Sequence, residues 1–483
     1  MSLVNTTSVR ESLDQLRSDY ERMSIAGQLS EEATALFTGL ITLVEVLVSI
    51  FLERTTKKDN KNSSKPSSQT EKDESAQSIH GSNSRGKKES DEQFSSSRTK
   101  ESTRVSVAKV CDICGEDMSE TPCTGHERRT KIDIVFEKVV EHIDAEIKTC
   151  PNCESEVKGK FPEDMPGPLQ YGNGLKAYLI NLVVSQMISL SRIQKMITTL
   201  IGITIAESSI IKYVLQLYHS LEAWENSAKT AIEQSLVINC DDTSLRAEKK
   251  NYWVHVYSSG VVTLKLLHPK RGTAAVEDIG IIPHYGGIIV HDCWAPYFSY
   301  QNCQHALCGS HILRELAFVI ESNNYRWAKC MKKLLQETCK KVSKSKSKKL
   351  SSKENANLVK RYRATITRGE KEMPEIPLRV DGKRGRIAKS DAHNLLERLK
   401  THEEAVLMFA KVSYVPFTNN RAERDLRMGK VKQKVSGCFR SESLAKAYCR
   451  ISSYLTTMAN RGFNPLIAIQ MALAGNAPLE GGE

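Results

Sequence analysis

Residues 235–245 read SLVINCDDTSL, in which a short apolar stretch, Leu236–Ile238, leads to two adjacent aspartates, Asp241 and Asp242. Apolar and β-branched residues in so short a run predict a buried strand. An aspartate that ends a strand is, by itself, more often a turn or helix-capping residue than a catalytic one. The stretch therefore indicates chemistry only if further carboxylates reach the same edge of a sheet.

The chain that follows extends this pattern. Two β-rich runs, 251–259 and 261–269, surround a Ser-Ser-Gly hairpin signal. The stretch GGIIVHDCWAPY contains a further strand, Ile288–Val290, that ends in Asp292, and HALCGSHILREL adds a fifth strand that runs into a helix. Three antiparallel strands followed by strand–helix alternation predict an RNase H-like α/β domain. If the two strands that end in aspartates are neighbours, their carboxylates meet at one sheet edge.

A third carboxylate lies inside a basic run near the C-terminus, NNRAERDLRMGK. Asn420 and Glu423 suit the N-cap and N3 positions of a helix, and capping alone is a sufficient structural reason for this glutamate. Together with Asp241 and Asp292, however, Glu423 forms an acidic triad of the kind that holds two divalent cations. Asp425 is expected to be a solvated residue of the first turn.

Basic side chains share the helical face of Glu423. Arg427, Lys430 and Lys434 follow it at steps of four, three and four residues, and Arg424 is its neighbour in the chain. Such a stripe suits DNA phosphates. The composition agrees, because 69 Lys+Arg against 57 Asp+Glu leave a net charge of +12, which favours nucleic acid as the partner.

The cysteine count and the apolar segments bear on location. An odd number of cysteines, 13, without a secretory signal predicts a reducing compartment. The long apolar run Ala33–Leu52 contains Glu45 and several Thr and Ser residues, so it is a poor membrane span. We therefore expect a cytoplasmic protein that associates with the nucleoid and not with a membrane.

The N-terminal region has a heptad pattern. Its apolar seam consists of Leu29, Ala33, Leu36, Leu40, Leu43, Leu47 and Ile50. This spacing predicts either a coiled coil that joins chains or, equally, a helix that packs against its own domain. Residues 54–106 are rich in Ser, Lys, Glu and Asp and almost free of apolar residues, which predicts a disordered linker.

Two C-x-x-C knuckles follow the linker, and they predict a structural zinc site with four thiolate ligands. The ligands are Cys111, Cys114, Cys150 and Cys153. A redox role is the alternative for either pair, but a redox site needs only one knuckle. Cys123 and His126, between the knuckles, are second-rank ligands, and the alternating stretch Lys131–Ile147 is expected to form strands.

A helical region precedes the first predicted strand. One helix begins at about Ser191, Gly202 breaks it, and a second begins at about Ala206. The lengths and the glycine turn suit a helix-turn-helix, although any two packed helices look similar. Its exposed DNA-binding face would consist of Ser208, Ser209 and Lys212.

Together these motifs resemble transposases of the insertion sequence 66 (IS66) family, of the Asp-Asp-Glu type. The resemblance extends from Cys111 to Ile467 and is most specific in VPFTNNRAERDLRMGKVKQKVSGCFRSESLAKAYCRISSYL, which is similar to the family's third catalytic block. Position by position, it implies that Asp241, Asp292 and Glu423 are the catalytic residues. It also implies a reaction, namely hydrolysis at the 3′ ends of the element and transfer of those ends to target DNA.

Two further features of the resemblance concern the site. The family's first block usually reads Asp-Glu-Thr, whereas this chain reads Asp-Asp-Thr, so Asp242 either substitutes for or assists the first ligand. The family also shows a Cys-x-x-His after the second block, which here is Cys308 and His311. These two residues either assist the metal site or are a packed cysteine and a helix-opening histidine.

The sequence thus predicts a two-Mg²⁺ site, a structural Zn²⁺, and DNA (element ends and target) as the partner of a homo-oligomer that acts with any accessory proteins of the element. The predicted segments are 1–53 (coiled coil), 54–106 (linker), 107–160 (zinc module), 167–230 (helical DNA-binding region), 231–320 (first part of the RNase H-like core), 321–410 (helical basic insertion) and 411–475 (second part of the core). The alternatives are an RNase H-like nuclease or resolvase without strand transfer, and an inactive zinc-containing DNA-binding regulator.

Overall fold

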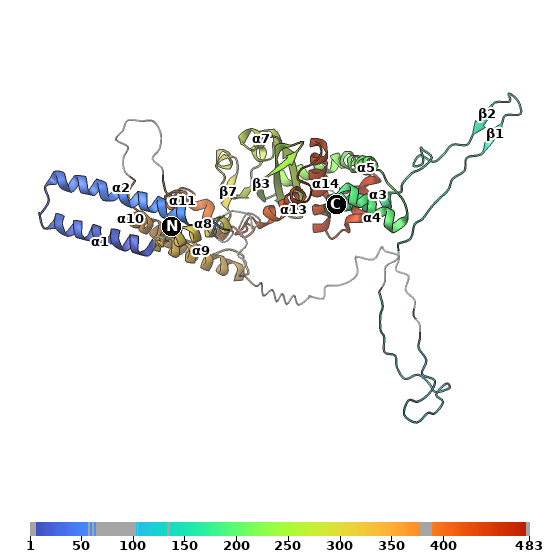
Figure 1. The fold of residues 1–483 in the computed structure, drawn as a ribbon, viewed down its shortest axis with the longest axis horizontal. Helices are drawn as coiled ribbons and strands as arrows, with labels where there is room; N and C mark the ends of the chain where they lie inside the picture. Colours follow the sequence, from blue (N-terminus) through green and yellow to red (C-terminus); the bar gives the residue numbers. More distant parts are fainter. Residues whose placement is uncertain are drawn as a thin grey trace. The chain divides into compact units, whose positions relative to one another are not determined.

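The computed structural model describes residues 6–56, 58–59, 62–63, 103, 105–132, 136–376 and 389–479 (Figure 1). They belong to two compact units. The larger unit is built from segments within 1–76, 173–189 and 211–483, and the smaller from segments within 77–172 and 190–210. Most of the linker predicted at 54–106 lies outside the described residues, and its first two residues, Arg54 and Thr55, belong to the helix Glu31–Thr55.

A mixed five-stranded sheet forms the centre of the larger unit. Its strands are β3 (Val237–Ala247), β4 (Lys250–Ser259), β5 (Val262–His268), β6 (Ile288–His291) and β7 (Gln304–Leu307). They lie in the order β5-β4-β3-β6-β7, with β3, β4 and β5 antiparallel and with β6 and β7 parallel to β3. All five predicted strands form. The expectation that the first strand stops before Asp241 is wrong, because β3 pairs with β4 as far as Ala247.

One hydrophobic cluster covers the antiparallel half of the sheet. It joins β3, β4 and β5 to α3 (Asn173–Val184), α6 (Glu222–Glu233), α14 (Glu442–Asn460) and α15 (Pro465–Leu473). Trp224 of α6 and Tyr454 of α14 are fully buried, and their rings meet edge to face with 5.2 Å between centroids. Such aromatic pairs add to the stabilisation from burial. The helix α7 (Thr273–Ile279) follows β5.

A second cluster covers the parallel half. It contains side chains of β6 and β7 and of the helices that separate β7 from α13 (Asn420–Ser436). These helices are α8 (Gly309–Asn323), α9 (Arg326–Lys344), α10 (Ser352–Glu372), α11 (Asp391–Thr401) and α12 (Glu403–Lys411). Trp327 and Tyr362 are its largest fully buried side chains. Ser351 and Glu354 form a capping box that opens α10 after the lysine-rich turn.

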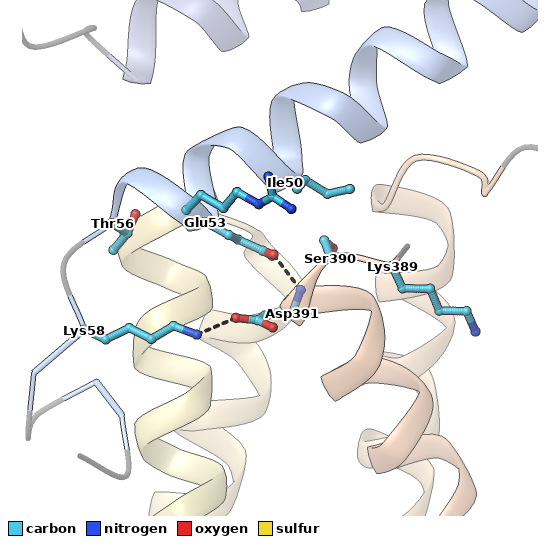
Figure 2. Close-up of a pocket in the computed structure, with 8 residues that line it drawn as sticks. Ile50, Glu53, Thr56, Lys58, Lys389, Ser390 and Asp391 are labelled. Carbon is cyan, nitrogen blue, oxygen red and sulfur yellow. Dashed lines mark hydrogen bonds and ion pairs between the residues drawn. The ribbon is translucent and has the colours of Figure 1, made fainter. Parts of the chain in front are cut away.

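The N-terminal residues form a helical hairpin of α1 (Thr6–Ile25) and α2 (Glu31–Thr55). The end of α2 is held on the insertion helices by Glu53, whose carboxylate accepts hydrogen bonds from the backbone N–H groups of Asp391 (2.5 Å) and Ala392 (2.9 Å). Figure 2 shows this contact in a pocket that is lined on its other side by Lys389 and Ser390. Burial raises the pKa of Glu53.

Among the described helices, α2 is long and apolar enough to cross a membrane by length and composition. A core helix of a soluble protein passes the same test, so length and composition alone are weak evidence for a membrane span. One face of α2 is buried within the unit through Val46, Ser49 and Leu52. The heptad residues Leu36, Leu40, Leu43 and Leu47 remain 45–69% exposed. The helix therefore has a packed face and a separate exposed apolar seam.

The smaller unit contains a short antiparallel hairpin of β1 (Ile147–Thr149) and β2 (Glu156–Lys158). The strands expected over Lys131–Ile147 are absent from the described part of that stretch, and β1 begins only at Ile147. Their apolar residues have no sheet to cover them, and Val139 is 89% exposed. The alternation of residues was therefore not a strand signal here.

The predicted helix, glycine break and second helix are present. The helix α4 (Leu190–Ile201) ends at Gly202, whose φ of +69° is a conformation that glycine adopts at no steric cost. Gln194 donates to the carbonyl of Ile205 (3.0 Å) and closes the turn before α5 (Glu207–Ser220). Ser208 and Lys212 are exposed on α5, whereas Ser209 is half-buried.

Candidate active site

The register of the parallel strands places two aspartates side by side. Asn239 of β3 is paired with Val290 of β6. Asp241 and Asp292 each lie two residues further along the chain, so they occupy equivalent positions beyond the last paired residues of β3 and β6. Side chains two residues apart on a strand point to the same side of the sheet. The two carboxylates are therefore neighbours at the edge where β6 ends and β3 continues.

The charges of both other predicted catalytic carboxylates, Asp292 and Glu423, affect Asp241. Burial raises the pKa of Asp241 to about 8, and the negative charge of Asp292 is the next cause. The charges of Asp242 and Glu423 raise the pKa of Asp241 further. Carboxylates repel one another in this way only when they are close and poorly screened. The structure thus brings Asp241, Asp292 and Glu423 within electrostatic range of one another.

Asp242 has a different partner. Its carboxylate accepts hydrogen bonds from Arg271 Nε (2.8 Å) and from the Arg271 terminal nitrogen Nη2 (3.3 Å). The Arg271 guanidinium lies over the rings of Trp253 and Trp294, 4.8 Å from each centroid. Burial raises the pKa of Asp242, and Arg271 opposes this shift. The sequence did not predict this role of Arg271, because Arg271 lies 29 residues from Asp242 and no local pattern links the two.

Glu423 is positioned by a buried asparagine that precedes its helix. Asn419 is fully buried, donates from its side chain to the carbonyl of Cys240 (2.7 Å) and accepts from the side chain of Asn239 (2.9 Å). These bonds attach the start of α13 to β3, next to Asp241. Glu423 lies in the first turn of α13, and its backbone N–H donates to the carbonyl of Asn419 (3.3 Å).

Two details predicted for this helix are wrong. Asn420 is not the N-cap, since α13 begins at Asn420 with Asn419 as its N-cap, and no side-chain capping bond forms. The capping box with Glu423 is therefore absent, because the Asn419 side chain is used on β3 instead. Asp425 is 8% exposed, not solvated. It accepts hydrogen bonds from Ser258 (2.8 Å) and Thr263 (2.9 Å) and so fastens α13 to the β4–β5 hairpin.

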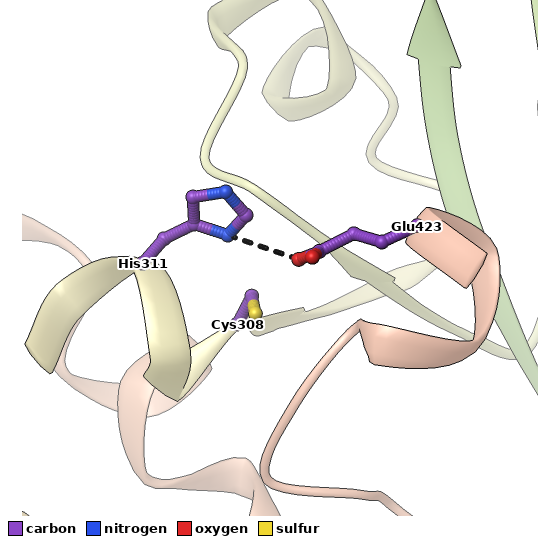
Figure 3. Close-up of side chains that lie close together, drawn as sticks. All are labelled: Cys308, His311 and Glu423. Carbon is purple, nitrogen blue, oxygen red and sulfur yellow. Dashed lines mark ion pairs between the residues drawn. The ribbon is translucent and has the colours of Figure 1, made fainter. Parts of the chain in front are cut away.

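The carboxylate of Glu423 faces the start of α8. Glu423 Oε1 lies 3.7 Å from His311 Nδ1 and 3.8 Å from a terminal nitrogen of Arg314. Figure 3 shows Cys308 beside this pair, and ligand atoms of Cys308, His311 and Glu423 all lie within 4.8 Å of one another. Burial lowers the pKa of His311 and raises the pKa of Cys308. The sequence identified Cys308 and His311 but neither Arg314 nor the contact with Glu423.

One of the four cations of the predicted basic stripe is hydrogen-bonded within the protein. Arg424, Arg427 and Lys434 are exposed on α13. Lys430 is half-buried, and its amine donates to the carbonyl (2.7 Å) and hydroxyl (3.1 Å) of Ser244 on β3. Three of the four cations therefore remain available to a ligand, and the fourth helps to hold α13 on the sheet.

The two cysteine knuckles in the smaller unit have the same backbone structure. In the first, Cys111 N–H donates to Glu116 (2.9 Å) and Gly115 N–H to Cys111 (2.9 Å). In the second, Cys150 N–H donates to Ser155 (2.8 Å) and Glu154 N–H to Cys150 (2.9 Å). Each turn thus presents its two cysteines alike. Among the residues that the structure describes, no three of the four sulfurs lie within 4.8 Å of one another.

The fourth residue after the first cysteine has a left-handed φ in both knuckles, +78° at Gly115 and +56° at Glu154. Hydrogen bonds from the Cys114 and Ile113 backbone lower the pKa of Cys111. The Ser155 hydroxyl lowers the pKa of Cys153. Between the knuckles, Cys123 Sγ lies 3.8 Å from His126 Nε2.

Comparison with known protein families gives the identity. The model of the family described as "Transposase IS66 family" matches residues 168–447, which is more than half of the chain. The chain belongs to the IS66 transposase family. No curated protein matches the sequence. The matched residues of the transposase include Asp241, Asp292 and Glu423, whereas the cysteine knuckles and the N-terminal hairpin precede the match.

Proposed function

We propose that this transposase binds the ends of an insertion sequence, hydrolyses phosphodiester bonds there with divalent cations, and transfers the ends to target DNA. The observation that carries this proposal is the β3–β6 register, which places Asp241 and Asp292 at equivalent positions; the charge of Glu423 adds to that of Asp292 in raising the pKa of Asp241. A cluster of mutually repelling carboxylates is costly unless a bound cation or a proton neutralises part of its charge.

An RNase H-like catalytic core is part of this proposal. Its support is the sheet, in which a three-stranded antiparallel meander is continued by two parallel strands with helical crossovers. In such a sheet the first and fourth strands are central neighbours, so residues at their ends share one site. The long helical segment between β7 and α13 then interrupts the core without separating Glu423 from the two aspartates.

The three carboxylates fit Mg²⁺, which prefers oxygen ligands. When bound, the cations would activate the attacking water or 3′-hydroxyl and stabilise the leaving oxygen. The residues of the chain hold this arrangement, since β3 and β6 position Asp241 and Asp292, and Asn419 positions Glu423. We propose Asp241 as the first ligand, with Asp242 kept in an ion pair by Arg271 (2.8 Å) beside it.

DNA would be held by basic residues at two places. Arg424, Arg427 and Lys434, with the more engaged Lys430, extend from the site along α13 and suit backbone phosphates. The exposed residues Ser208 and Lys212 of α5, with the half-buried Ser209, are proposed as a second contact in a helix-turn-helix. Phosphate contacts alone carry no sequence information, so recognition of the element ends needs base contacts such as those proposed for α5.

A structural Zn²⁺ is proposed for Cys111, Cys114, Cys150 and Cys153. Its support is the matching hydrogen-bond pattern of the two knuckles, since equivalent turns are what a four-cysteine site joins. Binding one Zn²⁺ would bring the two pairs together and order the segment between them.

A homo-oligomer is proposed because two DNA ends must be paired. The exposed seam on α2 (Leu36, Leu40, Leu43 and Leu47) has the spacing of a coiled coil and is separate from the buried residues Val46, Ser49 and Leu52. A cytoplasmic location at the nucleoid and the participation of accessory proteins of the element complete the proposal.

The test is Mg²⁺-dependent cleavage of duplex DNA that carries the sequence flanking the gene, at matched DNA occupancy. Glu423→Gln should lower the cleavage rate by several orders of magnitude while DNA binding persists, because it removes a cation ligand but keeps the shape. Glu404→Gln, at an 86% exposed glutamate of α12, is the matched control. Equal rates for Glu423→Gln and the control would remove Glu423 from the active site.

The first ligand and the DNA stripe are tested in the same assay. Asp241→Asn should abolish cleavage, whereas Asp242→Asn should retain part of it if Asp242 only assists. Arg427→Ala should weaken binding to any DNA and reduce the salt dependence by about one phosphate contact. Greater damage from Asp242→Asn than from Asp241→Asn would reverse the assignment of the two aspartates.

A further inference from the structure

Cys308, His311 and Glu423 form a second group of possible metal ligands, which shares Glu423 with the carboxylate triad. Cys308 directly follows β7 and is the N-cap of α8, His311 lies in the first turn of α8, and Glu423 lies in the first turn of α13. One ligand atom from each lies within 4.8 Å of the other two, and Figure 3 shows the three side chains converging. The residues come from chain segments more than one hundred positions apart, so the convergence is a property of the tertiary structure.

Two of these ligand atoms are buried and have no hydrogen-bond partner among the residues that the structure describes. They are His311 Nδ1 and Glu423 Oε1, which lie 3.7 Å apart. A buried polar atom without a partner costs about 1–3 kcal/mol, so such pairs in folded proteins commonly mark an ion or water position. Ligand atoms around a tetrahedral zinc ion, with bonds of about 2.0–2.3 Å, lie roughly 3.5 Å apart, which is close to the separation seen here.

Two features of the Cys308 sulfur would stabilise a metal-bound thiolate. Cys308 is 1% exposed, and its sulfur accepts a hydrogen bond from the backbone N–H of Asn419 (3.1 Å). It also sits at the N-terminus of α8, where the helix dipole favours negative charge. Binding would release the thiol proton to solvent and leave the thiolate as the ligand. Asn419 therefore contacts the sulfur while its side chain positions the helix that carries Glu423.

We propose that Cys308, His311 and Glu423 bind a zinc-class transition-metal ion, and that this ion competes with magnesium for Glu423. A thiolate, an imidazole and a carboxylate together select Zn²⁺ or Co²⁺ over Mg²⁺, which prefers oxygen ligands alone. While such an ion holds Glu423, the carboxylate is withdrawn from Asp241 and Asp292. Zinc is then an inhibitor of cleavage. Only this inhibition rests on the proposed function; the binding of the ion does not.

The binding test uses the full chain, freed of metal under reducing conditions and titrated with Co²⁺ and with Zn²⁺. Wild type should bind one more ion per chain than Cys308→Ser or His311→Asn, and this additional Co²⁺ should contribute thiolate charge-transfer absorption. Cys303→Ser changes another buried cysteine, five residues earlier in the chain, and should bind as many ions as wild type. Equal uptake by wild type, Cys308→Ser and His311→Asn, with circular dichroism showing all three folded, would overturn the proposal.

The inhibition test adds Zn²⁺ to the Mg²⁺-dependent cleavage reaction and compares each variant with its own zinc-free rate. Zinc should inhibit wild type and Cys303→Ser at concentrations at least tenfold lower than those that inhibit Cys308→Ser. Equal sensitivity would overturn the sharing of Glu423, even if the additional ion is bound. Absence of cleavage by every variant without zinc would instead count against the proposed function and would leave the binding result intact.

Discussion

Lys265 of β5 is a buried cation, and the effect of its burial on the free energy of unfolding can be measured. It is 3% exposed, and its amine donates to the hydroxyls of Ser452 (2.7 Å) and Thr456 (3.2 Å) on α14. Burial lowers the pKa of Lys265 from 10.5 to about 8, and the charge of Asp425 opposes the shift only in part. Lys265→Met keeps most of the volume of the side chain and removes its charge.

The sign of the pH dependence follows from proton binding in the two states. Below pH 8 the native and the unfolded chains both hold the lysine proton, so the cost of burying the ammonium is present in full. Between pH 8 and 10.5 the native chain releases the proton first, so the unfolded chain binds more protons and stability rises with pH. A shift from 10.5 to about 8 corresponds to about 3 kcal/mol at 1.36 kcal/mol per unit.

The assay is urea denaturation at pH values from 7.5 to 10.5. The free energy of unfolding of wild type minus that of Lys265→Met should increase by up to about 3 kcal/mol across this window. Lys250→Met, at an exposed lysine that opens the neighbouring strand β4, controls for the chemical change itself. A wild-type minus Lys265→Met difference that does not change with pH would refute the reasoning.

Four further outcomes are expected from the packing and the knuckles. Gly287→Ala should lower the free energy of unfolding by about 1–3 kcal/mol, since its Cβ would lie 2.8 Å from the carbonyl of Leu236. The control Gly286→Ala has open space for its Cβ, and equal melting temperatures of the two variants would contradict the prediction. Asp425→Ala should lower the free energy of unfolding in urea by about 2–3 kcal/mol, because two buried hydroxyls lose their acceptor. A decrease below about 0.5 kcal/mol, as is usual at exposed sites, would instead indicate a solvated residue. Glu53→Ala should increase proteolysis after α2, because the N-terminus of α11 loses its acceptor; an unchanged digestion pattern would mean that other contacts hold the hairpin. Cys114→Ser should lose about one zinc ion per chain by elemental analysis, and full retention would exclude the four-cysteine site.

The sequence alone determined the features that depend on short stretches of chain. Alternation and apolar runs identified all five strands of the sheet, and Gly202 identified the break between α4 and α5, because each signal is local. The aspartates at 241 and 292 could be expected to meet because residues just beyond neighbouring strands share a sheet edge. The same local logic failed at Lys131–Ile147, where an alternating pattern has no partner strand in the described residues.

The tertiary structure decided which side chains meet. Asp241 and Asp242 are adjacent in sequence, yet Asp241 is affected by Asp292 and Glu423 while Asp242 is paired with Arg271. Asp425 is buried on the β4–β5 hairpin although it lies in a run of charged residues that includes Glu423, Arg424 and Arg427. Strand register and helix docking set these outcomes, and neither is encoded in a short window of sequence.

The surroundings of Glu423 illustrate the physical reason. The sequence pattern gave Glu423 a place in the first turn of a helix, but its partners on α8 belong to a segment more than one hundred residues away. Asn419 brings the two segments together by bonding Cys240, Asn239 and Cys308 at once. Periodicity reports which face of an element is apolar, whereas the identity of the atoms that meet depends on the packing of whole elements.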